Sequence, residues 1–200
     1  KRLVELVAER KPTNIVDIAT GTGDVAISMA KKIPTSQIVG IDLSEEMLKV
    51  AQQKIERFSI KPNIRLLCED AENLSLSSNT FDIITISFGI RNFENIVNGL
   101  SECHRILKEG GSLFIMEFST PKHKVFNVLY RIYSKHILPL IGQVISNDDK
   151  AYKYLPESIV EFNREHEFTE LLLNNGFDSC ISISLSNGIA HIYIGVKSKM

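Results

Sequence analysis

Stretches with the apolar pattern of β-strands alternate with helical stretches along the first 120 residues of the chain. The strand-like stretches are rich in Ile and Val and cover residues 14–19, 37–42, 64–68, 81–87 and 112–118. Helical spacing falls at residues 3–9, 24–32, 44–58 and 94–107. The stretch at 81–87 is apolar almost throughout, as expected when helices cover both faces of a sheet. This order predicts right-handed crossovers and a doubly wound, mostly parallel α/β sheet.

The pattern changes after Pro121. Residues 121–160 hold a long apolar helical stretch and then a polar and aromatic one, which we interpret as a helical insertion. The rest of the chain predicts a helix and two strands, at residues 160–175, 177–185 and 189–197. The link Ser186-Asn-Gly188 between the two strand patterns is a strong signal for an antiparallel hairpin. We therefore expect a single domain over residues 1–200, with a seven-stranded sheet that ends in this hairpin.

Charge and composition exclude several classes of protein. The 23 Lys and Arg residues against 24 Asp and Glu give a net charge of −1, so no nucleic-acid partner is expected. The nearest approach to a membrane span, residues 137–145, is far shorter than the ~18 apolar residues required. Three scattered cysteines and five histidines without metal-ligand spacing indicate no metal site and a cytoplasmic location. Because the chain starts at Lys1 inside a helical pattern, we expect a trimmed N-terminus.

A glycine loop lies between the first strand and the helix that follows it. Gly21-Thr22-Gly23 sits where the chain must turn tightly and where a backbone without side chains can approach a ligand. Asp42 ends the next strand, 19 residues after Gly23. A carboxylate there can accept both hydroxyl groups of an adenosine ribose. The combination predicts a nucleotide-binding site.

The charges around this loop favour one kind of nucleotide. Asp24 begins the helix at which a dinucleotide would place its pyrophosphate, and Asp17 lies near the end of the first strand. Two carboxylates facing two phosphates argue against NAD. S-adenosylmethionine carries an ammonium and a sulfonium group, which acids attract. The plainer alternative is that Asp24 only offsets the helix dipole and that Asp17 points away.

Further polar residues end the third and fourth strands. Asp70 and Ala71 follow the strand at 64–68, where a carboxylate or a backbone amide can meet adenine, and Ser87 ends the strand at 81–87. Open α/β sheets bind ligands at the carboxyl ends of their strands. We expect these residues to join the glycine loop and Asp42 in one cleft, although Asp70 also fits an ordinary polar strand end.

Four segments of the sequence are similar to the C-methyltransferases of menaquinone and ubiquinone biosynthesis. The first is widespread among class I methyltransferases, and the second and fourth are more specific. They are Ala19-Thr-Gly-Thr-Gly-Asp24, Thr85-Ile-Ser-Phe-Gly-Ile-Arg-Asn92, Arg105-Ile-Leu-Lys-Glu-Gly-Gly111 with Met116-Glu-Phe-Ser119, and Asn147-Asp-Asp-Lys-Ala-Tyr-Lys-Tyr-Leu-Pro-Glu-Ser158. Members of this family carry a further segment before the position of Lys1, which helps to enclose cofactor and substrate.

The resemblance implies a Rossmann-like class I fold and methyl transfer from S-adenosylmethionine to a ring carbon of a polyprenylated quinol. Residues 1–120 would bind the cofactor, 121–160 would cover the substrate, and 161–200 would add a helix and the hairpin. The family's cofactor contacts match Thr22, Asp42, Asp70, Ala71 and Ser87. Demethylmenaquinol is the favoured substrate, with a ubiquinone precursor as the alternative.

Chemistry at a ring carbon suggests further candidates. Arg91 could stabilise a phenolate or orient a water that takes its proton, and its alternative role is a salt bridge or a helix cap. Tyr152 and Tyr154 could stack on the quinol ring or simply pack the insertion. The basic and apolar residues of 122–145 fit either a helix over the sheet or peripheral contact with an anionic membrane. A homo-oligomer is an open option.

Two other functions remain compatible with the residues alone. A methyltransferase acting on oxygen or nitrogen of another small molecule would share the cofactor cleft. A nicotinamide-dependent oxidoreductase, or a nucleotide-binding module without catalysis, would share the glycine loop, although a terminal antiparallel hairpin is unusual for a dinucleotide dehydrogenase.

Overall fold

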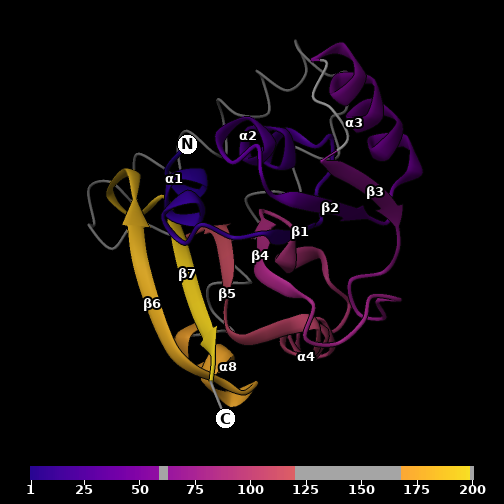
Figure 1. Ribbon diagram of the computed structural model, residues 1–200. Coiled ribbons are helices and arrows are strands. Elements are labelled where there is room, and N and C mark those ends of the chain that lie inside the picture. Colours follow the sequence, from indigo (N-terminus) through magenta and orange to yellow (C-terminus); the bar gives the residue numbers. More distant parts are fainter. Residues whose placement is uncertain (59–62, 120–167, 199–200) are drawn as a thin grey trace, which may run out of the picture.

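The computed structural model describes residues 1–58, 63–119 and 168–198 and has a seven-stranded sheet at its centre (Figure 1). The strand order is β3-β2-β1-β4-β5-β7-β6. The first five strands pair in parallel, and β7 pairs antiparallel with both β5 and β6. The sequence-based expectation of a doubly wound, mostly parallel sheet with a terminal antiparallel hairpin is confirmed.

The strands are β1 (Asn14–Ile18), β2 (Gln37–Asp42), β3 (Ile64–Cys68), β4 (Phe81–Ser87), β5 (Leu107–Phe118), β6 (Phe177–Leu185) and β7 (Ala190–Lys197). The described helices are α1 (Arg2–Glu9), α2 (Asp24–Lys32), α3 (Glu45–Arg57), α4 (Ile96–Ile106) and α8 (Phe168–Asn174), with short 3₁₀ turns at Ile90–Asn92 (η1) and Ser186–Gly188 (η3). Capping fixes two helix starts, since the side chain of Ser44 accepts from the Met47 amide and that of Asn95 from the Asn98 amide.

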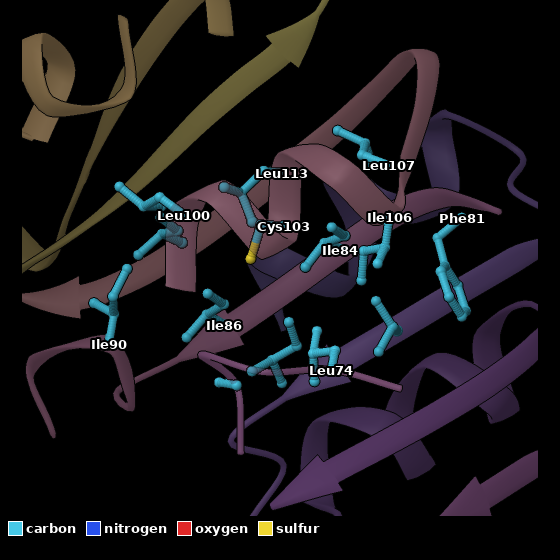
Figure 2. Packing of buried hydrophobic residues seen from close by; sticks show 14 of the residues in the cluster. Leu74, Phe81, Ile84, Ile86, Ile90, Leu100, Cys103, Ile106, Leu107 and Leu113 are labelled. Atoms are coloured by element: carbon cyan, nitrogen blue, oxygen red, sulfur yellow. The ribbon is translucent and has the colours of Figure 1, made fainter. Parts of the chain in front are cut away.

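Two apolar layers cover the two faces of the sheet. On one face, α4 packs on β4 and β5 and α8 packs on β6 and β7, and Figure 2 shows Leu100 and Cys103 of α4 close to Ile86 and Leu113 of the strands. On the other face, α1, α2 and Ile55 of α3 pack on the apolar side chains that the strands of the sheet turn to that side. Because β1 and β4 are buried on both faces, they read in the sequence as almost continuous apolar runs.

The predicted boundary between the fourth helix and the fifth strand is wrong, because β5 begins at Leu107 and not at residue 112. The helix expected at 94–107 ends at Ile106, because Leu107 adopts an extended backbone and pairs with Phe81 at the start of β5. The two glycines expected to stop the helix lie instead in an irregular part of β5, where the register with β4 shifts. The amine of Lys197 on β7 donates to the carbonyls of His104 and Leu107 and caps the helix end.

The expected insertion at 121–160 and the first residues of the helix predicted at 160–175 lie outside the described residues. The described end of that helix is α8. The four carboxyl ends of β1, β2, β3 and β4 are aligned by the register of the parallel pairs, which places the residues that follow them along one edge of the sheet.

Candidate active site

The loop after β1 is wound into conformations that side chains rarely adopt. Ala19, Gly21 and Gly23 all have positive φ, at 54°, 57° and 77°. A Cβ atom at Gly23 would lie 3.0 Å from the Cβ of Ala51, so α3 packs directly on the loop. The glycines are therefore required both by the turn and by the close approach of α3.

Asp42 joins the end of β2 to this loop. One carboxylate oxygen accepts the backbone amide of Gly21 at 2.7 Å, and the other accepts the amide of Ser44 at 3.0 Å. A carboxylate oxygen can accept more than one hydrogen bond, so both keep capacity for a ligand hydroxyl. The predicted pairing of the glycine loop with Asp42 is thus present.

Asp17 lies beneath the loop and is almost fully buried. Its carboxylate accepts hydrogen bonds from Thr20 Oγ1 at 2.7 Å and Thr85 Oγ1 at 2.5 Å, which tie β1 to the loop and to β4. Burial raises the pKa of Asp17 to about 6, against the lowering effect of the two hydroxyl groups. Asp17 thus acts as a support of the loop.

Asp24 does not present an unpaired charge to the loop. Its side chain is 74% exposed and pairs with Lys54 of α3 at 2.9 Å. Lys54 also donates to Thr22 Oγ1 at 2.8 Å, and its hydrogen bond lowers the pKa of Asp24. The sequence argument that Asp24 would repel a diphosphate is therefore wrong, because a lysine thirty residues further along supplies the compensating charge.

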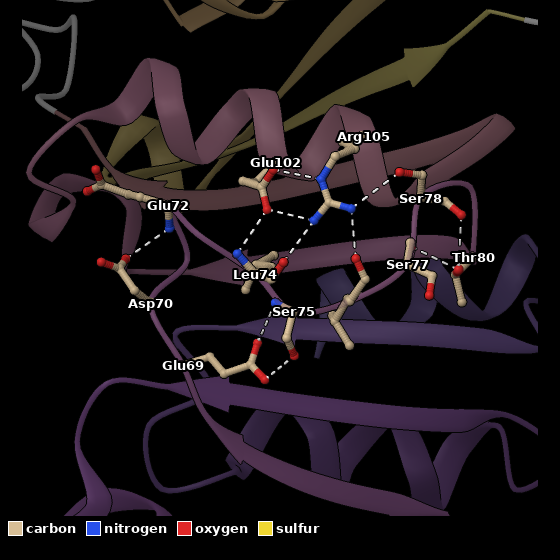
Figure 3. A network of polar contacts seen from close by, with 11 residues as sticks. Glu69, Asp70, Glu72, Leu74, Ser75, Ser77, Ser78, Thr80, Glu102 and Arg105 are labelled. Carbon is tan, nitrogen blue, oxygen red and sulfur yellow. Dashed lines mark hydrogen bonds and ion pairs between the residues drawn. The ribbon is translucent and has the colours of Figure 1, made fainter.

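The loop after β3 carries Asp70 and Ala71 and is held from α4 (Figure 3). Asp70 Oδ1 accepts the Glu72 amide at 2.9 Å, which forms a local turn, and Ala71 is buried. Arg105 of α4 donates to the carbonyls of Leu74 and Leu76, and its partner Glu102 accepts the Leu74 amide. The loop thus has a fixed shape at the same sheet edge as Asp42.

The end of β4 leads into a tight turn with polar groups beneath it. Ser87 Oγ is buried and has no hydrogen-bond partner among the described residues. Phe88 has a positive φ of 58°, and the η1 turn that follows places Arg91 against Glu117 of β5, with Nη1 and Oε1 2.6 Å apart. The sequence analysis named Ser87 and Arg91 but missed Glu117. The sequence did carry a signal for Glu117, because it is the single acidic residue in the otherwise apolar run 113–118.

Comparison with known proteins identifies this arrangement. A model described as the ubiE/COQ5 methyltransferase family matches residues 1–197. The chain belongs to this family. It is 37% identical to the demethylmenaquinone methyltransferase of Porphyromonas gingivalis over 98% of this chain and 81% of that protein. It is 41% identical to the ubiquinone/menaquinone biosynthesis C-methyltransferase UbiE of Geotalea uraniireducens, over 92% of this chain and 78% of that protein.

Solved structures support the fold. A methyltransferase dependent on S-adenosylmethionine from Aquifex aeolicus matches with a TM-score of 0.68 at 17% identity, covering 96% of this chain and 89% of that one. The family match confirms the expected methyltransferase with S-adenosylmethionine as methyl donor.

The described residues of this family member fit that cofactor. The turn at Gly21 and Gly23 brings backbone close to the sheet edge, Asp42 has free acceptor capacity, and Ser87 Oγ is a buried polar atom that still needs a partner. No group of three or more His, Cys, Asp or Glu side chains in the described ranges is arranged to hold a metal ion. In those same ranges, no helix has the length and apolar character to span a bilayer. Tyr152 and Tyr154 lie outside the described residues.

Proposed function

We propose that this methyltransferase acts on a ring carbon of a polyprenylated quinol, with demethylmenaquinol as its foremost substrate. The observation that carries the proposal is the similarity over nearly the whole chain to relatives named demethylmenaquinone methyltransferase. The relative from Geotalea is named for both ubiquinone and menaquinone biosynthesis, so a ubiquinone precursor is the second candidate.

In this proposal the cofactor lies along the carboxyl ends of the first four strands. Asp42 accepts the ribose hydroxyls, the loop after β3 borders the adenine, and the turn after β1 receives the methionine part. The residues assigned to these contacts are Gly21, Thr22, Gly23, Asp42, Asp70, Ala71 and Ser87. When bound, S-adenosylmethionine supplies an electrophilic methyl group on a sulfonium, which is a good leaving group.

Arg91 is the residue that we assign to the quinol. A ring carbon becomes more nucleophilic when the neighbouring hydroxyl loses its proton, and a guanidinium stabilises the resulting phenolate. Arginine stays protonated at neutral pH, so the proton passes to a water that Arg91 orients and not to Arg91 itself. The salt bridge to Glu117 is compatible with this role, because it engages only Nη1.

We further propose that the insertion at 121–160 covers the substrate, with Tyr152 and Tyr154 against the quinol ring. Its basic and apolar residues would rest on an anionic membrane surface, where a polyprenylated substrate resides. Co-sedimentation with anionic vesicles is expected at low salt and lost at high salt. Absence of binding at both salt concentrations would remove the membrane contact from the proposal. Light scattering would decide between a monomer and a homo-oligomer.

The test of the substrate is methyl transfer in vitro. The purified protein is incubated with methyl-labelled S-adenosylmethionine and either demethylmenaquinol or the demethylated ubiquinol precursor. We expect label on the ring carbon of the naphthoquinol. A thermal shift with S-adenosylhomocysteine and none with NADH is the accompanying control for the cofactor. Label on an oxygen or nitrogen acceptor, with neither quinol methylated, would contradict the proposal.

A further inference from the structure

Glu117 is a buried acid in the strand next to Arg91. It is the penultimate residue of β5 and only 1% exposed. Its neighbours Ile115 and Met116 belong to opposite apolar layers, so strand alternation places Glu117 on the face that α4 and α8 cover. A carboxylate in such a position persists only when it is paired, and Arg91 is its charged partner.

Glu117 uses one of its two oxygens. Oε1 accepts from Arg91 Nη1 at 2.6 Å and from the Phe118 amide at 2.9 Å. Oε2 is buried and has no hydrogen-bond partner among the described residues. Burial raises the pKa of Glu117, while the charge of Arg91 opposes that change. The carboxylate is thus fixed at one oxygen and has free acceptor capacity at the other.

Arg91 is anchored in a matching way. Its Nη1 donates both to Glu117 Oε1 and to the carbonyl of Phe88, at 2.6 and 2.7 Å. The guanidinium lies 5.8 Å from the ring centroid of Phe118, which stacks on Phe88. Nε is buried and has no partner in the described part of the chain. Both anchors therefore hold the same nitrogen, and the Nε edge of the planar group keeps its donor capacity.

The geometry differs from that of an ion pair that uses its full hydrogen-bonding capacity. In the fork arrangement, two guanidinium nitrogens meet two carboxylate oxygens. Here one guanidinium nitrogen meets one carboxylate oxygen, and within the described residues a buried donor, Arg91 Nε, and a buried acceptor, Glu117 Oε2, are left over. Buried polar groups without partners are rare in folded proteins, and each one requires an explanation. A guanidinium held by one nitrogen with an unused donor edge is suited to receive an oxyanion at that edge.

We propose that Glu117 is the positioning residue of the reaction: it holds Nη1 of Arg91 so that the opposite edge of the guanidinium faces the quinol oxygen. The proposal rests on the proposed function, because it needs Arg91 to act on a phenolate. Glu117 itself touches neither cofactor nor substrate in this assignment. Its effect on turnover therefore passes entirely through Arg91.

The first experiment measures kcat, the KM for the quinol and the Kd for S-adenosylhomocysteine in Glu117→Gln, Arg91→Ala and the double variant. Glu117→Gln keeps the shape and removes the charge. We expect kcat to fall at least tenfold with the Kd unchanged within threefold, and the double variant to match Arg91→Ala within twofold. A kcat within twofold of wild type, or losses that multiply in the double variant, would overturn the proposal.

Matched variants separate positioning from folding. Lys108→Ala removes an ion pair of similar length, 2.7 Å to Asp82, at the opposite edge of the sheet and is expected to keep wild-type kcat. Glu117→Asp keeps the negative charge, but its side chain is one methylene group shorter, so the carboxylate lies further from Arg91. We expect its kcat to lie between those of wild type and Glu117→Gln. If Glu117→Gln does not fold, an Asp variant with wild-type kcat would overturn the proposal.

A second measurement does not depend on turnover. In wild-type protein labelled with ¹⁵N at arginine, the two anchors on Nη1 should restrict rotation of the Arg91 guanidinium and give separate Nη resonances, assigned by their loss in Arg91→Lys. In Glu117→Gln or Glu117→Asp these resonances should merge. Unchanged resonances would overturn the positioning role. Wild-type protein that methylates neither quinol but shows separate Arg91 resonances that merge in Glu117→Gln would overturn the proposed function and leave the anchoring of Arg91 by Glu117 intact.

Discussion

Two of the protein's arginine–glutamate pairs, Arg105 with Glu102 and Arg91 with Glu117, are built differently. Arg105 and Glu102 lie one turn apart on α4, with both carboxylate oxygens bonded to the guanidinium at 2.7 Å. The remaining donors of Arg105 hold carbonyls of the loop after β3, as Figure 3 shows. Arg91 and Glu117 come from different elements, are more deeply buried and share a single hydrogen bond between their side chains.

The difference separates holding a loop from serving a ligand. The pair on α4 uses its hydrogen-bonding capacity on the protein itself, as a structural network does. Among the residues that the structure describes, the pair between η1 and β5 leaves a buried donor and a buried acceptor without partners, at a cost in stability of about 1–3 kcal/mol for each group. Loss of Arg105 should therefore act on stability and cofactor affinity, and loss of Arg91 on turnover.

Arg91→Ala is expected to give the largest effect. Removal of one donor that stabilises an oxyanion lowers kcat by about 10² to 10³ in other enzymes. We expect a kcat loss of that size for the quinol, with affinity for S-adenosylhomocysteine within threefold of wild type, as measured by calorimetry. Equal losses in kcat and in cofactor affinity would erase the distinction between the two pairs.

Asp17→Asn extends the comparison to a buried acid that accepts hydrogen bonds from two hydroxyl groups and has no cationic partner among the described groups that shift its pKa. The pKa of Asp17 is about 6 in the folded protein against 3.8 for a free side chain, so the folded state binds more protons between these values. The stabilisation by this proton is full below pH 3.8 and lost as the pH rises through 6, a change of about 3 kcal/mol. Urea unfolding across this range should show that decline in wild type and not in the variant. If the free energy of unfolding changed with pH in the same way in wild type and in Asp17→Asn, the assigned role of the Asp17 proton would be excluded.

Arg105→Ala should have an intermediate effect of a different kind. The variant removes a charged partner and the bonds to two loop carbonyls, so we expect a stability loss of about 2 kcal/mol. Because the loop carries Asp70 and Ala71, the Kd for S-adenosylhomocysteine should rise about tenfold with kcat at saturation nearly unchanged. Arg105→Lys is the matched control, since it keeps the charge but not the fork. A drop in kcat without a change in Kd would place Arg105 with Arg91.

The contrast between these pairs also shows what the sequence could and could not predict. Asp42 and Ser87 could be placed at one edge of the sheet because parallel strands share their carboxyl ends there, which follows from chain order alone. The roles of Glu117 and Arg105 were not predicted, because Glu117 pairs with a side chain, and Arg105 holds carbonyls, about thirty residues away. No periodicity in the sequence reports such a contact. The start of the fifth strand was predicted at residue 112 instead of Leu107 for the same reason, since Leu107 pairs with Phe81 of another strand.

The smallest effect is expected at Lys54 with Asp24, a pair that is more exposed than either arginine–glutamate pair. Asp24 is 74% exposed, and exposed ion pairs typically contribute less than about 1 kcal/mol. We expect Lys54→Met to lower the free energy of unfolding by no more than this, with a dependence on salt weaker than in wild type.

Cofactor affinity tests the charge argument directly. S-adenosylmethionine carries a sulfonium where S-adenosylhomocysteine carries a neutral thioether. If Asp24 attracts the cationic methyl donor once its lysine is removed, the affinity of Lys54→Met for S-adenosylmethionine should rise relative to its affinity for S-adenosylhomocysteine. An unchanged ratio of the two affinities would show that Asp24 serves the helix and the lysine only, and that the choice of cofactor is made by Asp42, Ser87 and the shape of the glycine turn.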